Sequence, residues 1–225
     1  MKCIYAHNKS WGKKAFEQLC RVDLKNDWGF VQDNAELESI FDKEIDIIFF
    51  VHWSHRVPEH IIYQVECVCF HMTDLPFGRG GSPLQNLILR GHKETKLTAI
   101  RMTNRFDEGP IYAKWNLSLE GTAQEIYERT TYLANKGILE LLSADRKPAP
   151  QEGDVVMFQR RTKEDSELPS DLSLDETYDF IRMLDADGYP NAYIVRNGMK
   201  WELFEAKKSD QGLIARIRIQ ANEEC

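Results

Sequence analysis

The sequence has no surplus of basic residues. Its 225 residues include 29 lysines and arginines against 36 aspartates and glutamates, which gives a formal net charge of −7. Proteins that bind nucleic acids or anionic membranes do so largely through positive charge that neutralises phosphate groups. The acidic balance therefore argues against a nucleic acid or a membrane surface as a partner.

Long apolar runs are also missing. The longest one, residues 45–51 with Asp46 inside it, is far shorter than the ~20 residues that a membrane-spanning helix needs. The first residues turn polar again at His7 without a small-residue cleavage site, so we expect a first strand there and no signal peptide. The five cysteines are odd in number and irregularly spaced, unlike a disulfide framework. We therefore expect a cytoplasmic protein.

A glycine-rich dinucleotide motif is absent after the first predicted strand. Residues 7–12 at this place read His-Asn-Lys-Ser-Trp-Gly. A dinucleotide-binding oxidoreductase would carry Gly-x-Gly-x-x-Gly here, because its backbone must approach the pyrophosphate closely. That class of enzyme is therefore disfavoured.

Strand and helix patterns alternate through the first part of the sequence. Ser10 and Asn34 are expected to cap the first two helices. The predicted strands cover residues 2–6, 28–31, 46–53 and 67–72. Such alternation is typical of an open, mostly parallel sheet with helices on both faces, whose ligands bind beyond the carboxyl ends of the strands. We predict an α/β fold with a Rossmann-like core.

Two further strands, residues 95–102 and 110–117, precede a long helix with a capping box at Thr122 and Glu125. We expect the first domain to end with this helix, at residue 146.

The remaining sequence is predicted to form a connector and a small subdomain. Residues 147–169 are rich in proline and charge around one short strand, and residues 170–225 carry the pattern of a helix and a β-hairpin. Signals in the subdomain are a capping box at Ser173 and Glu176, an Asn197-Gly198 turn, and an alternating strand over 213–219. An exposed hairpin edge makes a homodimer plausible.

The strand that ends at His71 brings three metal-ligating residue types to one face. Cys67, Cys69 and His71 share that face because strand side chains alternate. Neighbours on it are ~6.6 Å apart, however, whereas two thiolates on one zinc ion lie within ~4 Å. We therefore expect no metal and interpret both cysteines as small buried residues.

Two segments resemble the signatures of folate-dependent formyltransferases. Residues 70–83 are similar to the loop in which that family has Asn-x-His at a strand end, then Leu-Pro and a glycine-containing stretch. Residues 107–111, Asp-Glu-Gly-Pro-Ile, resemble the family's Asp-x-Gly motif. Single matches between and beyond them are Gly91, Thr95, Thr98, Met102, Ile181–Leu184, Tyr189-Pro190 and Ala192. The resemblance is strong over residues 45–115 and implies a formyltransferase catalytic domain at residues 1–146.

The resemblance implies that His71 and Asp107 are catalytic. Formyl transfer needs a base for the attacking amine and donors for the developing oxyanion, and a histidine oriented by an aspartate can serve here. The family's asparagine falls on Cys69, whose thiol is a weak donor. We expect Asn104 to take the place of the family's asparagine as the oxyanion donor. The alternative is that the protein binds folate or a nucleotide sugar and is catalytically weak or silent.

The implied co-substrate is 10-formyltetrahydrofolate. Residues expected to bind it are Trp53, Arg56, Val57, Asp74, Leu75, Pro76, Phe77 and Arg105. Residues expected to bind the acceptor are His7, Asn8, Lys9, Arg79, Gly80, Gly81 and Ser82, some of them at the amino end of a helix.

The acceptor implied by the resemblance is a nucleotide-linked amino sugar. Methionyl-tRNA enzymes of this family carry a basic carboxyl-terminal barrel, whereas the tail here is short and the whole chain is acidic. Glycinamide ribonucleotide enzymes carry a glycine-rich phosphate loop after the first strand, where this sequence has residues 7–12 instead. Residues 71–89 are most similar to the branch that formylates 4-amino-4,6-dideoxy sugars in pseudaminic acid pathways of surface polysaccharide synthesis. We expect UDP-4-amino-4,6-dideoxy-N-acetyl-altrosamine as the acceptor, with another small amine as the alternative.

Overall fold

The computed structural model describes residues 1–41, 44–144 and 146–221. The chain packs into two compact units. The first contains Met1–Gly80, Thr95–Leu117 and Glu128–Met157, and the second contains Gly81–Glu94, Ser118–Tyr127 and the chain from Phe158 onward. The single boundary near residue 146 stays a prediction.

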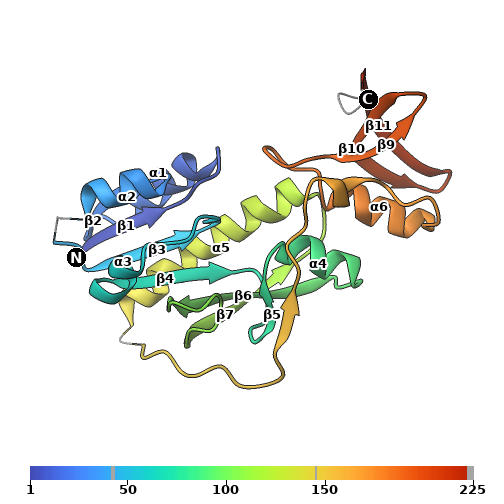
Figure 1. Cartoon of the computed structure of the whole chain (residues 1–225). Coiled ribbons are helices and arrows are strands. Elements are labelled where there is room, and N and C mark those ends of the chain that lie inside the picture. Colours follow the sequence, from blue (N-terminus) through green and yellow to red (C-terminus); the bar gives the residue numbers. More distant parts are fainter. Residues whose placement is uncertain (42–43, 145, 222–225) are drawn as a thin grey trace. The chain divides into compact units, whose positions relative to one another are not determined.

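A six-stranded sheet in the order β2-β1-β3-β4-β6-β7 forms the centre of the first unit (Figure 1). Its strands are β1 (Lys2–Ala6), β2 (Asp27–Val31), β3 (Ile47–Val51), β4 (Glu66–His71), β6 (Glu94–Arg101) and β7 (Ile111–Ser118). β1 pairs in parallel with β2 and β3, β3 pairs in parallel with β4, and β6 runs antiparallel to β4. The predicted α/β class with a mostly parallel sheet is confirmed.

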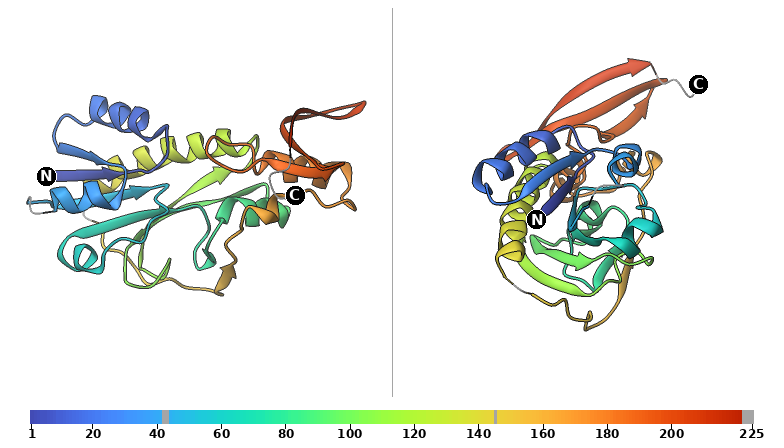
Figure 2. Two further views of the ribbon diagram at one scale, coloured as in Figure 1. Left: turned by 45° about the horizontal axis from the view of Figure 1, so that its top comes forward. Right: turned by 90° about the vertical axis from the view of Figure 1, so that its left-hand side faces the viewer.

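The central strands of this sheet carry apolar side chains on both faces, and helices cover both faces. Side chains two residues apart, such as Ile48 and Phe50, lie in one core cluster with residues of α2 and α3. On the other face, α1 and α5 lie side by side (Figure 2), and the side-chain amide of Asn135 donates to the carbonyl of Ala15 at 2.9 Å. The helices are α1 (Gly12–Val22), α2 (Asn34–Ile40), α3 (Glu59–Gln64) and α5 (Ala123–Ser143).

Two of the expected helix caps are displaced by one residue. α1 has Trp11 as its N-cap rather than Ser10, and the N-cap side chain makes no capping hydrogen bond. α2 has Asp33 as its N-cap rather than Asn34, and the Asp33 carboxylate accepts the Glu36 N–H at 2.8 Å. A charged acceptor at a helix N-terminus is stabilised by the helix dipole as well as by the hydrogen bond.

The glycine-containing stretch after β4 is a strand and not the predicted loop. β5 (Phe77–Gly80) pairs with β8 (Val156–Phe158) in a two-stranded sheet. Its partner lies far along the chain, so a pattern over a few residues does not reveal the pairing.

The second unit contains α4 (Pro83–Leu89), α6 (Leu174–Arg182) and an antiparallel sheet in the order β11-β10-β9. Its strands are β9 (Ala192–Arg196), β10 (Met199–Ser209) and β11 (Gly212–Ala221). The turn at Asn197-Gly198 and the last strand are found as predicted, but β11 is exposed along most of its length and its burial does not alternate.

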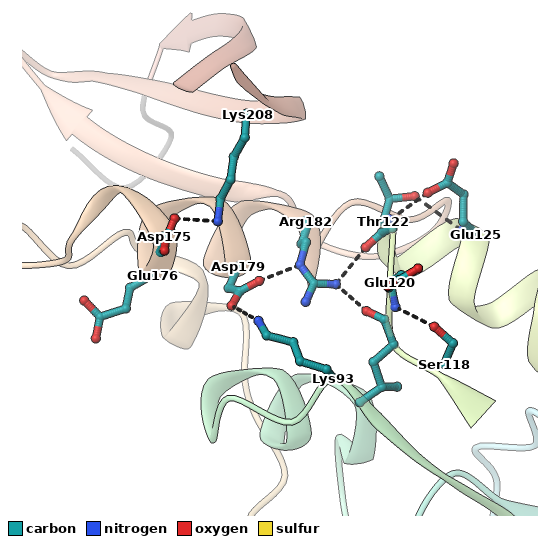
Figure 3. Close-up of polar contacts among 12 residues, drawn as sticks. Lys93, Ser118, Glu120, Thr122, Glu125, Asp175, Glu176, Asp179, Arg182 and Lys208 are labelled. Atoms are coloured by element: carbon teal, nitrogen blue, oxygen red, sulfur yellow. Dashed lines mark hydrogen bonds and ion pairs between the residues drawn. The ribbon is translucent and has the colours of Figure 1, made fainter. Parts of the chain in front are cut away.

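A buried arginine joins α6 to the turn before α5 within this unit (Figure 3). Arg182 is 3% exposed, and its guanidinium donates to the carbonyls of Leu119 and Gly121 at 2.7 and 2.8 Å and to Asp179 at 2.6 Å. Asp179 also pairs with Lys93 at 3.2 Å. Removing the guanidinium would leave buried acceptors without donors, which costs about 1–3 kcal/mol for each.

Among the helices of the described residues, none has the length and apolarity needed to cross a bilayer. The same residues contain no group of His, Cys, Asp and Glu side chains placed to hold a metal ion.

Candidate active site

His71 and Asp107 lie together in the first unit. His71 is the last residue of β4, and Asp107 follows β6 in the turn that leads to β7. Their side chains are only 9% and 16% exposed, with His71 Nδ1 3.4 Å from Asp107 Oδ1. The antiparallel register of β4 and β6 places Thr98 opposite His71, and the chain leaves β6 beside the start of β4, where the Met102 N–H donates to the carbonyl of Cys67 at 2.8 Å. The turn between β6 and β7 therefore has to fold back along β4 for Asp107 to reach His71.

β5 contacts both members of this pair. His71 Nε2 lies 2.8 Å from the carbonyl of Gly78, and the Gly80 N–H donates to Asp107 Oδ2 at 2.9 Å. Both ring nitrogens of His71 therefore face acceptors. A ring protonated on Nε2 donates to Gly78, and an imidazolium would donate to Asp107 as well. The arrangement can accept a proton at Asp107 and present a donor at Nε2.

The glycine of the Asp-x-Gly motif has a steric role. A β-carbon at Gly109 would lie 1.7 Å from the carbonyl oxygen of Arg101, so only glycine lets the turn pass this close to β6. The Arg101 N–H donates to the carbonyl of Pro110 at 2.9 Å and closes the turn. Asp107 has a φ of 56°, a left-handed conformation uncommon for non-glycine residues. The backbone of the motif therefore aims the carboxylate at His71.

Cys69 and Asn104 lie in different surroundings. Burial, reinforced by the negative charge of Asp107, raises the pKa of the Cys69 thiol well above its ordinary value, so the thiol stays neutral. Asn104 is exposed in the turn before Asp107. Its role as an oxyanion donor stays a prediction.

The expected folate residues of the β3–α3 segment include two apolar side chains of the core and one exposed arginine. Val57 is buried in the core cluster, and Trp53 packs against that cluster. Within the described part of the chain, Trp53 Nε1 is buried and has no hydrogen-bond acceptor. Arg56 is exposed and pairs with Glu59 at 3.0 Å. A heterocycle bearing acceptors would satisfy the indole N–H.

The other expected folate residues lie in two turns near His71 and Asp107 in sequence. Lys114 holds the turn after β4, since its ammonium group contacts Asp74 at 2.5 Å and the carbonyl of Leu75 at 2.6 Å. Pro76 follows Leu75, and Phe77 begins β5. Arg105 is exposed and pairs with Glu108 at 3.5 Å.

The expected acceptor residues at the end of β1 form a packed group. His7 is fully buried, and the Lys9 N–H donates to its Nδ1 at 3.2 Å. Burial, with the charges of His52 and Lys9, lowers the pKa of His7 to about 3, so the ring is neutral. The side-chain amide of Asn8 lies against Ser54, with 2.6 Å between the amide and Oγ.

The amides expected to bind an acceptor anion are already used by the protein. The Gly80 N–H donates to Asp107, and in the second unit the Gly81 N–H donates to the carbonyl of Phe158 at 3.2 Å. Ser82 Oγ accepts the Arg161 N–H at 3.0 Å. Contacts within the protein, one with a side chain and one with a backbone carbonyl, therefore use the N–H groups of Gly80 and Gly81 that a flexible loop would have left free.

Comparison with known proteins identifies the family of this chain. A family model described as formyl transferase matches residues 15–142, which include His71 and Asp107 and more than half of the chain. The chain belongs to the formyl transferase family. A second model, described as the C-terminal domain of methionyl-tRNA formyltransferase, matches residues 163–220. The resemblance identified from the sequence is confirmed.

The curated relatives of this family member are longer than the chain. A methionyl-tRNA formyltransferase of Lactobacillus acidophilus is 28% identical over 200 residues, which cover 84% of this chain and 63% of that protein. The chain thus spans less than two thirds of that relative.

Solved structures share the fold. A structure described as methionyl-tRNA formyltransferase from Clostridium thermocellum has a TM-score of 0.95 and 41% identity, covering 99% of this chain and 100% of that one. A sugar N-formyltransferase from Shewanella has a TM-score of 0.70 and 18% identity, covering 93% and 98% of the two chains.

Sequence reasoning missed the residues that support the pair. Thr98 Oγ1 donates to the carbonyl of Thr73 at 2.6 Å, and Thr73 Oγ1 donates to the carbonyl of Gly78 at 3.2 Å. Gln151 donates to the carbonyls of Asp107 and Gly109 from the predicted connector. Thr98 had a signal in the family resemblance, whereas a single glutamine in a charged segment has none.

Proposed function

We propose that this chain transfers the formyl group of 10-formyltetrahydrofolate to a primary amine. The observation that carries the proposal is the contact between His71 and Asp107 inside the two matched motifs of a formyl transferase family member. The amine nitrogen attacks the formyl carbon and forms the new C–N bond, while the formyl oxygen takes up negative charge. The bond to N10 of the folate then breaks, and N10 receives a proton.

The two side chains have complementary roles in this reaction. Asp107 accepts the proton that leaves the attacking nitrogen, and His71 beside it stabilises the change in charge and shuttles the proton toward N10. Nε2 of His71, which donates to Gly78, turns this N–H to the formyl oxygen. A positioned acid or base of this kind contributes ~10² to 10⁴ in rate.

In this proposal the folate binds beside Trp53. Its pterin carries carbonyl and ring-nitrogen acceptors for the buried indole N–H, and Val57 supplies an apolar wall. Arg56 and Arg105 are exposed and can meet the carboxylates of the glutamate tail. Trp53, Arg56, Val57 and Arg105 are thus proposed to bind the folate, as expected from the sequence.

The acceptor in this proposal is the 4-amino group of a nucleotide-linked 4-amino-4,6-dideoxy sugar. The UDP-linked N-acetyl-altrosamine is the sugar that we favour. Cations on the sheet of the second unit pair with carboxylates of the same unit, which leaves less positive charge for a tRNA backbone. These pairs are Arg216–Glu205 at 3.0 Å, Arg218–Glu202 at 3.5 Å, Lys200–Glu202 at 3.4 Å and Lys208–Asp175 at 2.6 Å.

Methionyl-tRNA is the second candidate acceptor. It is favoured by the family match over residues 163–220 and by the names of the Lactobacillus and Clostridium relatives. The two acceptors differ in size and charge, so one experiment separates them.

The test supplies purified protein with 10-formyltetrahydrofolate and three acceptors in parallel: the UDP-amino-altrosamine, other nucleotide-linked amino sugars, and methionyl-tRNA. We expect mass spectrometry to show one added formyl group on a sugar and none on methionyl-tRNA. His71→Asn and Asp107→Asn should each lower the rate by ~10² or more with little change in melting temperature. Formylation of the tRNA alone would replace the acceptor, and no product with any acceptor would favour the silent binding protein.

The proposal extends to a homodimer through the second unit. β11 is an edge strand, and its Ile217 and Ile219 are 51% and 50% exposed. They lie opposite Leu203 and Trp201 of β10, so one face of the sheet carries an apolar row. A row of this kind can pack against its own copy about a two-fold axis.

Packing of faces is favoured over pairing of edges. Arg216 and Arg218 flank Ile217, and an edge-to-edge pair centred there would place arginines opposite each other. We expect light scattering to show a dimer that Ile217→Glu dissociates, while Arg216→Ala on the alternate face leaves it intact. A monomer at all workable concentrations would overturn the dimer.

A further inference from the structure

Gln151 satisfies its whole side-chain amide within the active-site region. Nε2 donates to the carbonyls of Asp107 and Gly109 at 2.7 and 2.8 Å. Oε1 accepts from Nε and Nη2 of Arg79 at 3.1 and 2.9 Å. Two donors and two acceptor positions are all that a primary amide offers. Such complete pairing defines one orientation of the group.

The two carbonyls that Gln151 holds belong to the turn that carries the catalytic carboxylate. Asp107 adopts a left-handed backbone conformation with a φ of 56°, and Gly109 passes against the carbonyl of Arg101. A non-glycine residue in that region costs of order 1–3 kcal/mol and persists only where its surroundings hold it. Gln151 supplies this support on both sides of Glu108.

The same amide connects the turn to β5 through Arg79. Arg79 lies between Gly78, whose carbonyl faces His71, and Gly80, whose N–H donates to Asp107. Its guanidinium is also 3.6 Å from Glu108 Oε1, with its side chain 13% exposed. Gln151 therefore joins the strand that contacts both catalytic side chains to the turn that presents one of them.

We propose that Gln151 is a positioning residue for formyl transfer, which acts by holding the Asp107 carboxylate at its distance and direction from His71. This inference rests on the proposed function of the His71–Asp107 pair. It assigns the connector after α5 a part in the reaction. Misplacing a catalytic group by about 1 Å costs ~10² in rate, so loss of Gln151 should be visible mainly in kcat.

Two substitutions separate the contacts of the amide. Gln151→Met removes all of them without adding charge. Gln151→Glu keeps an oxygen for Arg79 but loses both donors to the turn and sets a carboxylate against two carbonyls. We expect kcat to fall by ~10- to 100-fold in both, with the KM for folate within about threefold. Gln211→Glu, the same chemical change at an exposed position, should retain the wild-type rate.

A double-mutant cycle tests whether Gln151 works through Asp107. The variant Gln151→Met/Asp107→Asn should be no slower than Asp107→Asn alone, because the carboxylate that Gln151 positions is already gone. If the double variant lost the product of the two single-variant factors in kcat, the proposal would be overturned. A Gln151→Glu enzyme with wild-type kcat would also overturn it.

A second readout does not depend on any acceptor. The ring-nitrogen NMR shifts of His71 report its contact with Asp107, and we expect Gln151→Met to move them in the same direction as Asp107→Asn does. His71 signals unchanged in a folded Gln151→Met protein would overturn the positioning role even if the acceptor proved to be another amine. Absence of formyl transfer by the wild-type protein, with these signals shifted as expected, would overturn only the proposed function.

Discussion

Replacing Gly109 by alanine should disable formyl transfer while the protein stays folded. A β-carbon at this position would lie 1.7 Å from the carbonyl oxygen of Arg101 and 2.9 Å from its carbonyl carbon. Carbon and oxygen atoms that touch without a bond are about 3.3 Å apart or more. The turn therefore has to move away from β6 by about 1.5 Å, or β6 has to yield by that amount.

A movement of this size reaches His71 and Asp107, the pair proposed to be catalytic. Asp107 precedes Gly109 by two residues, and its carboxylate contacts His71 at 3.4 Å and the Gly80 N–H at 2.9 Å. A displacement of about 1 Å at a reacting group costs ~10² in rate, so we expect Gly109→Ala to lose at least that factor in kcat. Overpacking of this kind costs about 1–3 kcal/mol in the free energy of unfolding.

The assay compares kcat with 10-formyltetrahydrofolate and thermal melting for three proteins. Gly91→Ala is the matched control, because Gly91 has a φ of +77° but no atom within 4 Å of an added β-carbon. It should lose about 1–2 kcal/mol of stability to the left-handed backbone and retain its rate. A Gly109→Ala enzyme with more than half of the wild-type kcat would refute the steric reasoning.

Three further outcomes are expected. Cys69→Ala should retain much of the rate, whereas Asn104→Ala should lower it by ~10² to 10³ because an oxyanion donor is removed. If single-turnover kinetics showed the larger loss for Cys69→Ala, the thiol and not Asn104 would be the oxyanion donor. His7 has a pKa of about 3 in the folded chain against about 6.5 in the unfolded chain, so the folded protein binds this proton more weakly. Its contribution to the free energy of unfolding should be fully present above about pH 6.5 and should fall toward pH 3 by up to about 1.4 kcal/mol per pH unit. His7→Gln should flatten that slope in urea titrations, and identical slopes would contradict the assignment. Chelators should leave turnover and melting unchanged, and stoichiometric zinc lost together with activity would show that the Cys67–His71 strand binds metal after all.

Features set by neighbouring residues could be predicted from the sequence. The capping box of Ser173 and Glu176 is present in α6, and the Thr122 and Glu125 side chains bond reciprocally to each other's backbone before α5. The Asn197-Gly198 turn closes its hairpin as well. Each of these features depends on side chains within a few residues of the backbone groups that they satisfy, so a local pattern contains the information.

Features set by distant partners could not be predicted in this way. β5 contains Gly78 and Gly80, which weaken any strand pattern, and it becomes a strand by pairing with β8. That pairing uses the Gly81 amide that was expected to bind an anion. The motifs therefore identified two side chains that the structure brings together, His71 and Asp107, while several hydrogen bonds around them come from segments without a motif.

The site also extends past the end of the predicted catalytic domain. A fragment ending at residue 146 would keep His71, Asp107 and the whole six-stranded sheet, but it would lose Gln151 and the strand partner of β5. The Asp107 turn, whose φ of 56° is strained, would then lack both side-chain donors that hold its carbonyls. Strain without support relaxes, and the carboxylate moves with the backbone. If the pair acts as proposed, we expect an active fragment to need the chain at least to β8, because hydrogen bonds that hold the Asp107 turn and β5 arrive from beyond α5.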